Sequence, residues 1–266
     1  MIAIMNQYIR VYKTFLRLNI LKLFVYRADL FSSIIAHTIW SSFTIIQMLL
    51  LTSKTSYVFG WSRNDLLVLA AMYNIVYSFF YMFFSRGFGE FSTTIHVGRL
   101  DGVLIKPISS QFLMTTLYIT YTHGIRLILG IGFLVYMLSI MHVHITLLLM
   151  VGFMFIIFFS VMIIYSYWML IMTLTIWFPK LSNLSELLYQ VNSVAKFPQE
   201  IYKGASVYLL LTLFPLTLIV VTPVKYLLQK AFFSDILLLV IFACGMVFFS
   251  HFFWKFALRF YTSASA

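Results

Sequence analysis

Residues that could support nucleotide chemistry are missing from this sequence. A phosphate-binding loop needs a glycine-rich segment ending in Gly-Lys and then Ser or Thr, because its backbone amides and its lysine hold the phosphates. The dipeptide Gly-Lys occurs nowhere in the chain. We therefore predict that the chain is not an enzyme by itself, and we assign it no catalytic and no cofactor-binding residue.

The histidines do not have the spacing of a metal site. His142 and His144 form an isolated His-x-His, and two ligands do not complete a zinc site. His37, His123 and His251 fall in different predicted membrane helices, without a His-Glu-x-x-His spacing. We therefore predict no metal site.

All seven acidic residues fall in predicted loops or at helix ends. They are Asp29, Asp65, Glu90, Asp101, Glu186, Glu200 and Asp235. Carriers driven by ion gradients generally place an ionisable residue at membrane depth, where it binds the coupling ion. The pattern therefore favours an energy source outside this chain.

One cation, Arg126, lies deep in a predicted membrane helix, and His123 precedes it by three positions on the same face. Charges at membrane depth are costly and often functional. Two interpretations stay open: His123 and Arg126 line a translocation path, or Arg126 holds two helices together.

The amino-acid composition indicates that the predicted helices lie in a lipid bilayer. The chain is 62% hydrophobic and 9% charged, with a mean hydropathy of +0.99, whereas a soluble domain carries roughly 25% charge. Most of the lysines and arginines behind the net charge of +11 lie between apolar runs, where they orient the chain and meet anionic headgroups. We therefore expect membrane lipids, and no nucleic acid, as partners.

Charge-free intervals predict the membrane helices, because an unpaired charge at mid-bilayer costs on the order of 3 kcal/mol. The intervals are 30–53, 66–85, 127–179, 204–224 and 236–254. Since one crossing needs about 20 residues, the third interval predicts two helices, near 112–138 and 145–178. The predicted fold class is an all-α membrane protein with six transmembrane helices.

Residues 5–27 predict an amphipathic helix on the membrane surface. One face carries Asn6, Arg10, Lys13 and Arg17, and the opposite face carries Tyr8, Val11, Tyr12, Phe15 and Leu18. A basic tail that only sets orientation is the alternative. Basic residues are more frequent before the first span and in the second loop than in the first loop, which predicts cytoplasmic N- and C-termini.

The fifth span has two candidate positions. Hydropathy favours 204–224, but Pro215 and Pro223 interrupt that run, and prolines at membrane depth are typical of broken helices. The alternative is a short span at 184–197, followed by a proline-broken segment that re-enters the membrane.

The second loop, residues 86–111, combines charges, glycines and apolar residues in an amphipathic pattern. Docking onto a soluble partner would use that apolar content, and packing onto the bilayer surface is the alternative.

The same loop resembles the permeases of the ABC transporter type-2 family. Its shared positions are Arg86, Gly87, Gly98, Leu100, Asp101, Leu104, Lys106, Pro107 and Ser109. The resemblance continues in Phe197-Pro198, Ile201-Tyr202, Phe214-Pro215 and Thr222-Pro223, and in the ending Tyr261-Thr262-Ser263-Ala264-Ser265. Arg99 and the bulky Ile95-His96 depart from the family pattern.

The resemblance implies a single permease domain, 1–266, with an N-terminal interfacial elbow helix (5–27). It also implies a cytoplasmic coupling helix within 86–111 and a Pro-broken re-entrant segment (198–230) between spans five and six, which favours the short fifth span. We expect the docking residues to be Glu90, Phe91, Ile95, Arg99, Leu100 and Asp101.

The implied function is that of the permease subunit of an ATP-driven exporter in the bacterial cytoplasmic (inner) membrane. A second permease chain, identical or related, would complete the path, and separate ABC ATP-binding subunits would hold ATP and Mg²⁺. The alternatives are an ion-coupled secondary transporter, and a membrane scaffold or enzyme without transport.

Overall fold

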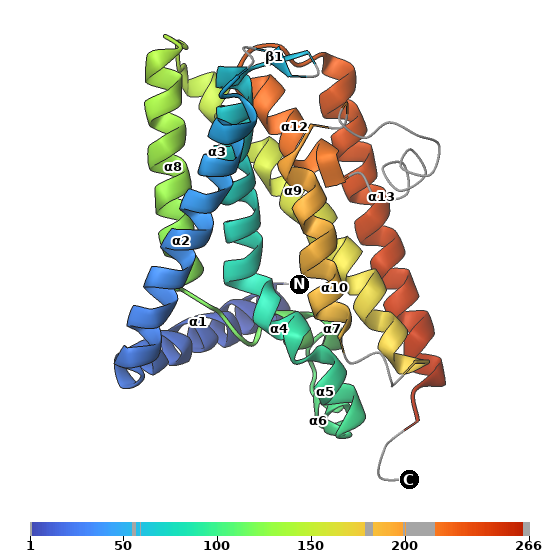
Figure 1. The fold of residues 1–266 in the computed structure, drawn as a ribbon. Helices are drawn as coiled ribbons and strands as arrows, with labels where there is room; N and C mark the ends of the chain where they lie inside the picture. The colour runs from blue at the N-terminus through green and yellow to red at the C-terminus, as the bar shows by residue number, and fades with distance from the viewer. Residues whose placement is uncertain are drawn as a thin grey trace.

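A computed structural model of the chain describes residues 2–54, 57–58, 60–178, 183–198, 200 and 216–262. Within these residues, five helices are long and apolar enough to cross a membrane, and they form a bundle (Figure 1). Their regular α-helical parts are α2 (Arg27–Leu51), α3 (Arg63–Phe80), α8 (His123–Ile140), α9 (Leu147–Thr173) and α13 (Phe233–Ala257). These five spans confirm the all-α membrane fold class.

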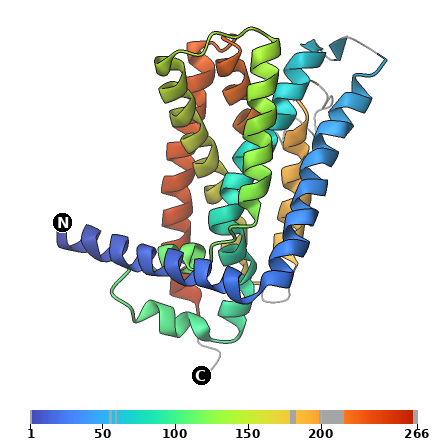
Figure 2. The same ribbon diagram turned by 90° about the vertical axis from the view of Figure 1, so that its left-hand side faces the viewer.

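The two ends of the bundle differ. A short antiparallel hairpin of β1 (Tyr57–Val58) and β2 (Trp61–Ser62) lies at one end, called the β end below. The helix α1 (Ile2–Val25) lies across the other end, called the α1 end (Figure 2).

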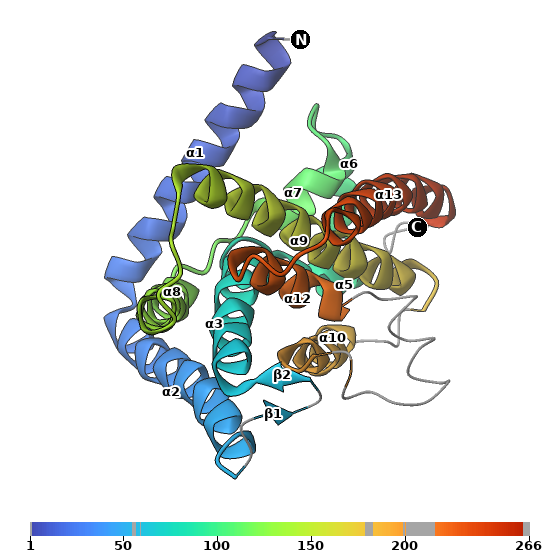
Figure 3. The same ribbon diagram turned by 90° about the horizontal axis from the view of Figure 1, so that it is seen from above.

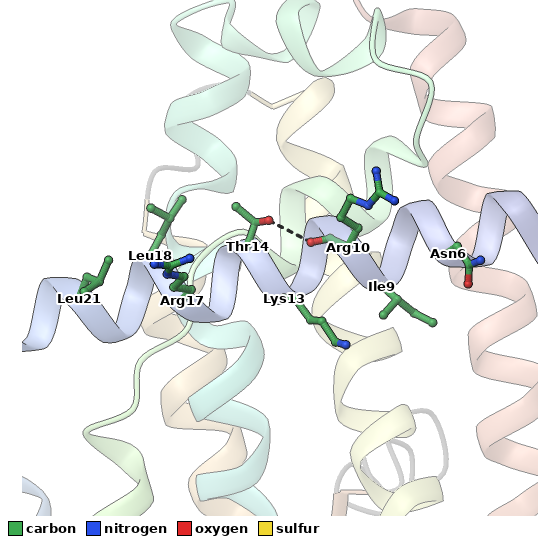
Figure 4. Close-up of a pocket in the computed structure, with 8 residues that line it drawn as sticks. All are labelled: Asn6, Ile9, Arg10, Lys13, Thr14, Arg17, Leu18 and Leu21. Atoms are coloured by element: carbon green, nitrogen blue, oxygen red, sulfur yellow. Dashed lines mark hydrogen bonds between the residues drawn. The ribbon is translucent and has the colours of Figure 1, made fainter.

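The helix α1 has the two faces that its sequence predicts. Arg10, Lys13 and Arg17 are exposed on its outer face, where they line a shallow hollow (Figure 4). On the inner face, the Tyr8 hydroxyl accepts a hydrogen bond from the Ser109 backbone N–H at 2.9 Å. Leu18 is a correction, because it was expected on the apolar face and is 51% exposed beside the basic residues.

The helix α3 lies at the centre of the bundle, where α2, α8, α9 and α12 (Leu216–Leu227) pack around it (Figure 3). From Asp65 to Phe80, every residue except Phe79 is buried. A π-helical segment, η1 (Tyr81–Ser85), continues α3 into α4 (Arg86–Gly89) and α5 (Phe91–His96). The apolar span therefore extends beyond the bundle at the α1 end, with one turn residue, Glu90, between α4 and α5.

The predicted third span, 112–138, is wrong as one continuous helix. The structure has α7 (Ser110–Thr116), a non-helical break at residues 117–122, and then α8. The Thr120 N–H donates to the Met82 carbonyl at 2.8 Å, and Asn19 Nδ2 donates to the Leu117 carbonyl at 3.1 Å. These partners outside the helix stabilise the break, because they satisfy backbone groups that a continuous helix would pair internally.

A sixth crossing is not among the spans of the described residues. Near the predicted short span lie α10 (Leu184–Asn192) and the 3₁₀ turn η3 (Ser193–Lys196), which together fall below the roughly 20 residues of a crossing. The helix α12 is also short, and its Ile219, Val220 and Val224 are buried against the bundle. Residues 201–215 of the predicted re-entrant segment lie outside the described residues.

An ion pair ties α12 to α3 at the β end. Lys230 Nζ, just after α12, lies 2.8 Å from Asp65 Oδ2. Asp65 also completes a capping box with Ser62 at the first turn of α3. Because the lysine is 56% exposed, solvent screens much of this attraction, and the pair contributes mainly to the position of α12.

Gly87, in the first turn of α4, packs directly against the backbone of α7. A Cβ atom there would lie 2.8 Å from the Thr115 carbonyl carbon and 2.9 Å from the Met114 carbonyl oxygen. Such distances require the backbone to shift, because a carbonyl group has no rotamer through which it can move away. The crossing of α4 and α7 explains why the Arg-Gly motif needs glycine.

We predict that Gly87→Ala lowers the free energy of unfolding by about 1–3 kcal/mol, because the added methyl group forces α4 and α7 apart. Thermal unfolding of the purified protein in detergent measures the effect. Gly89→Ala in the same helix is the matched control, since a Cβ at Gly89 meets no atom within 4 Å. Equal stability of the two variants would contradict this account of the crossing.

Candidate functional site

A polar cavity of about 310 Å³ lies between α2, α3, α8 and the α10–η3 segment. Its ionisable lining residues are His37, Tyr73, His123, Arg126, Glu186 and Lys196, together with Tyr81 and Tyr189. Asn74, beside Tyr73, is eleven residues into α3, or roughly 17 Å from the β end at a rise of 1.5 Å per residue. Tyr81 of the lining is eighteen residues into the same run, or roughly 27 Å. The polar cavity therefore extends from near the middle of a membrane core about 30 Å thick towards the α1 end.

Arg126 joins three helices at this depth. Its side chain is 8% exposed, and its Nε donates to Asn74 Oδ1 at 2.7 Å across the α3–α8 contact. Asn74 Nδ2 in turn points to the Ser41 carbonyl of α2 at 3.4 Å. Arg126 thus bridges the contact between α3 and α8, as the second interpretation of the sequence expects, and it also lines the polar cavity. That His123 and Arg126 line a translocation path stays a prediction.

Two cations of the polar cavity share one aromatic ring. The Arg126 guanidinium carbon lies 5.3 Å from the centre of the Tyr73 ring, and Lys196 Nζ lies 5.6 Å from the same centre. Such cation–π contacts partly offset the cost of placing charge in a low dielectric. Lys196 was not expected at the site, and nothing in its local sequence, at the end of a short helix, places it opposite α3.

The cations of the polar cavity are not neutralised by carboxylates. Within the described ranges, the ion pair of Lys230 with Asp65 is the only salt bridge within 4.0 Å. Glu186 is the acidic residue that lines the polar cavity, and it is exposed and accepts a hydrogen bond from Gln190 at 3.3 Å. With neutral histidines, the lining therefore carries a formal charge of +1.

His37 and His123 lie side by side, although the sequence placed them in different spans without a relation. Their ring centres are 4.2 Å apart, and His37 Nε2 lies 3.2 Å from the Thr122 hydroxyl. His123 Nδ1 is buried and has no hydrogen-bond partner among the described residues. The break at 117–122 brings the two rings together, because α8 begins at His123 directly beside α2.

A second candidate site lies at the α1 end, where α5 and α6 (Arg99–Leu104) form a helical hairpin that extends beyond the bundle (Figure 1). Gly98 joins the two helices with φ of +71°, a left-handed conformation that favours glycine. The motif position of Gly98 therefore has a conformational reason. This unit is called the α5–α6 hairpin below.

Three of the six predicted docking residues are buried within the chain. Phe91 and Leu100 are fully buried and Ile95 is 7% exposed, and the Phe91 ring contacts the Trp254 ring of α13 edge-on at 5.3 Å. In this conformation the three side chains anchor the α5–α6 hairpin to the bundle, and they are not accessible to a docking partner. Of the other three, Arg99 is exposed, and Glu90 and Asp101 are partly exposed.

The most exposed apolar side chains of the α5–α6 hairpin belong to residues that were not among the predicted docking residues. Val97 is 63% exposed and Ile105 is 84% exposed. Helical spacing is the signal that could have found them. Phe91 and Ile95 share one face of α5 at i and i+4, and Val97, two positions further, points elsewhere.

Tyr261, the first residue of the C-terminal segment that resembles the family, contacts Asp101 of the same hairpin. Burial and the neighbouring Asp101 carboxylate raise the pKa of the Tyr261 phenol. The structure thus brings together two segments that the sequence related only through a resemblance.

The chain was compared with known families and proteins. A family model described as "ABC-2 family transporter protein" matches residues 38–265. The matched range includes most of the polar cavity and the whole α5–α6 hairpin. No curated protein and no solved structure matches the chain.

We predict that Asn74→Leu lowers the free energy of unfolding by about 1–3 kcal/mol, because the buried guanidinium loses its partner. The double variant Asn74→Leu with Arg126→Leu should recover most of that loss, since the buried guanidinium is then removed together with its partner. A thermal double-mutant cycle in detergent measures the coupling. Simple addition of the two single losses would show that the pair does not act as a unit.

Proposed function

Because the chain belongs to the ABC-2 family of transporter proteins, we propose that it is the permease subunit of an ATP-driven exporter. Membership of this family implies partnership with ABC ATP-binding subunits. In this proposal those subunits bind ATP and Mg²⁺, and this chain supplies no catalytic residue. The polar cavity is its part of the translocation path.

The observation that carries the proposal is the helical connection between the two candidate sites. Tyr73 of the polar cavity, with Asn74 beside it, lies on the same helical run, Arg63–His96, as Phe91 and Ile95 of the α5–α6 hairpin. One turn residue, Glu90, separates α4 from α5 within this run. A displacement of the α5–α6 hairpin by a closing ATPase would therefore move the Asn74–Arg126 contact. Such coupling needs two arrangements of packed helices, between which ATP shifts the population.

The α5–α6 hairpin offers a surface suited to a soluble partner. Exposed Val97 and Ile105 supply apolar contact, and Glu90, Arg99 and Asp101 supply charge around it. An apolar centre with a polar rim is the usual anatomy of a protein interface. The buried residues Phe91, Ile95 and Leu100 transmit force from this surface to α13 and the bundle.

A second permease chain, identical or related, would complete the path. The polar cavity is lined by α2 and α10 among others, and α2 presents exposed apolar residues such as Phe31, Ile35 and Ile39. One chain thus supplies polar groups at membrane depth. The adjacent apolar face of α2 must be covered by lipid or by a helix of a partner. We assign the opposing wall of the path to the second chain.

We place the protein in the bacterial cytoplasmic membrane with the α1 end and both termini in the cytoplasm. The basic outer face of α1, with Arg10, Lys13 and Arg17, suits the anionic cytoplasmic leaflet. This orientation also places the α5–α6 hairpin where ATP-binding subunits are found.

The first test concerns docking. We predict that Val97→Asp with Ile105→Asp reduces co-purification of a co-expressed ABC ATP-binding subunit about tenfold or more, since charge in an apolar contact costs at least about 1.4 kcal/mol. Tyr57→Asp is the control, because Tyr57 is 72% exposed at the β end. Undiminished association of the double variant, with unchanged thermal stability, would argue against docking at this hairpin.

The second test concerns the energy source. The purified chain alone should show no ATP hydrolysis above background, and its complex with the ATP-binding subunit should hydrolyse ATP in proteoliposomes with or without a protonophore. ATP hydrolysis by the chain alone would overturn the proposal that a separate subunit carries the ATPase site. An ion-coupled carrier is instead expected to form no such complex.

A further inference from the structure

The polar cavity contains more positive charge than the chain itself uses. Arg126 has five N–H donors, and its hydrogen bonds to Asn74 and Tyr73 leave others for a ligand. Lys196, which also lines the cavity, forms no salt bridge within the described residues. The carboxylate of the lining, Glu186, is exposed and forms no salt bridge with either cation within the described residues. An unpaired charge at membrane depth is expensive, which points to an anion that arrives from outside the chain.

We propose that the polar cavity binds the acidic group of an amphipathic substrate, a carboxylate or a phosphate, between Arg126 and Lys196. This inference rests on the proposed function and names the substrate class of that path. Both cations lie near the Tyr73 ring centre, so at most about 11 Å, the sum of the two distances, separates them. A third polar group, the unpartnered Nδ1 of His123, lies in the same lining.

The rest of the lining suits an apolar body on that substrate. Trp40, Tyr81 and Tyr189 line the same cavity, and aromatic side chains offer flat apolar surface together with a polar edge. A volume of about 310 Å³ is at the lower end of ligand pockets, and the second permease chain would enlarge it. Cationic and neutral analogues should bind less well, because the +1 lining favours a negative group.

The proposal is tested by a matched pair of fluorescent probes. These are 11-(dansylamino)undecanoic acid and its methyl ester, which differ at the acidic group alone. Binding to the full chain in lipid nanodiscs is followed by energy transfer from tryptophan to dansyl. We expect the acid to bind at least tenfold more tightly than the ester, and Trp40→Phe to reduce the transfer signal.

Two charge variants locate the acid-binding group. Asn74→Asp places a carboxylate against Arg126, and Lys196→Gln removes the second cation. Each should weaken binding of the acid, by about tenfold for Asn74→Asp, and leave binding of the ester unchanged. Lys255→Gln, an exposed lysine of α13 outside the cavity, is the matched control. Thermal unfolding of each variant shows whether it is folded.

The outcomes separate this inference from the proposed function. Equal affinity for acid and ester, or unchanged affinity for the acid in both folded charge variants, overturns the anionic site, even if the complex hydrolyses ATP. Preferential binding of the acid that both variants abolish supports the site, and it does so whether or not an ATP-binding subunit co-purifies. Failure of that association counts against the proposed function alone.

Discussion

The arrangement of this bundle depends on how one guanidinium is accommodated at membrane depth. Lipid offers no partner to a charge, so Arg126 must find its hydrogen bonds within the protein. Asn74 provides one, and through Asn74 the contact reaches from α8 to α3 and on to the Ser41 carbonyl of α2. The same charge keeps the neighbouring space polar, because apolar side chains could not solvate it. The helix interface and the polar cavity are therefore two consequences of one buried cation.

The helix α3 connects this centre to the α1 end. It is buried along nearly its whole length, and it continues through η1 and α4 and, after a turn at Glu90, into α5. Two glycines make the continuation possible for different reasons. Gly87 allows the backbone of α7 to approach closely, and Gly98 adopts the left-handed conformation at the turn of the α5–α6 hairpin.

The break between α7 and α8 shows how backbone partners can outweigh apolar character. Residues 117–122 follow one apolar stretch and precede another, yet they are not helical. Their backbone groups pair with Met82 and with the side chain of Asn19 of α1. As a result α8 begins at His123, and the imidazole of that residue contacts the His37 ring of α2 at a tilted angle of 46°. A helix that continued through this segment would give His123 different neighbours.

The sequence by itself determined the all-α membrane class, four of the described spans, the basic face of α1 and the amphipathic pattern of residues 86–111. These features follow from local patterns, since exclusion of charge from lipid and the 3.6-residue period act within one segment. Tertiary structure alone decided that Lys196 and Asn74 join Arg126, that His37 meets His123, and that Phe91 and Leu100 face the core. Each of those outcomes depends on which helices pack together and on their relative shift along the bundle axis. The local pattern of one helix carries no information about contacts between segments far apart in the chain.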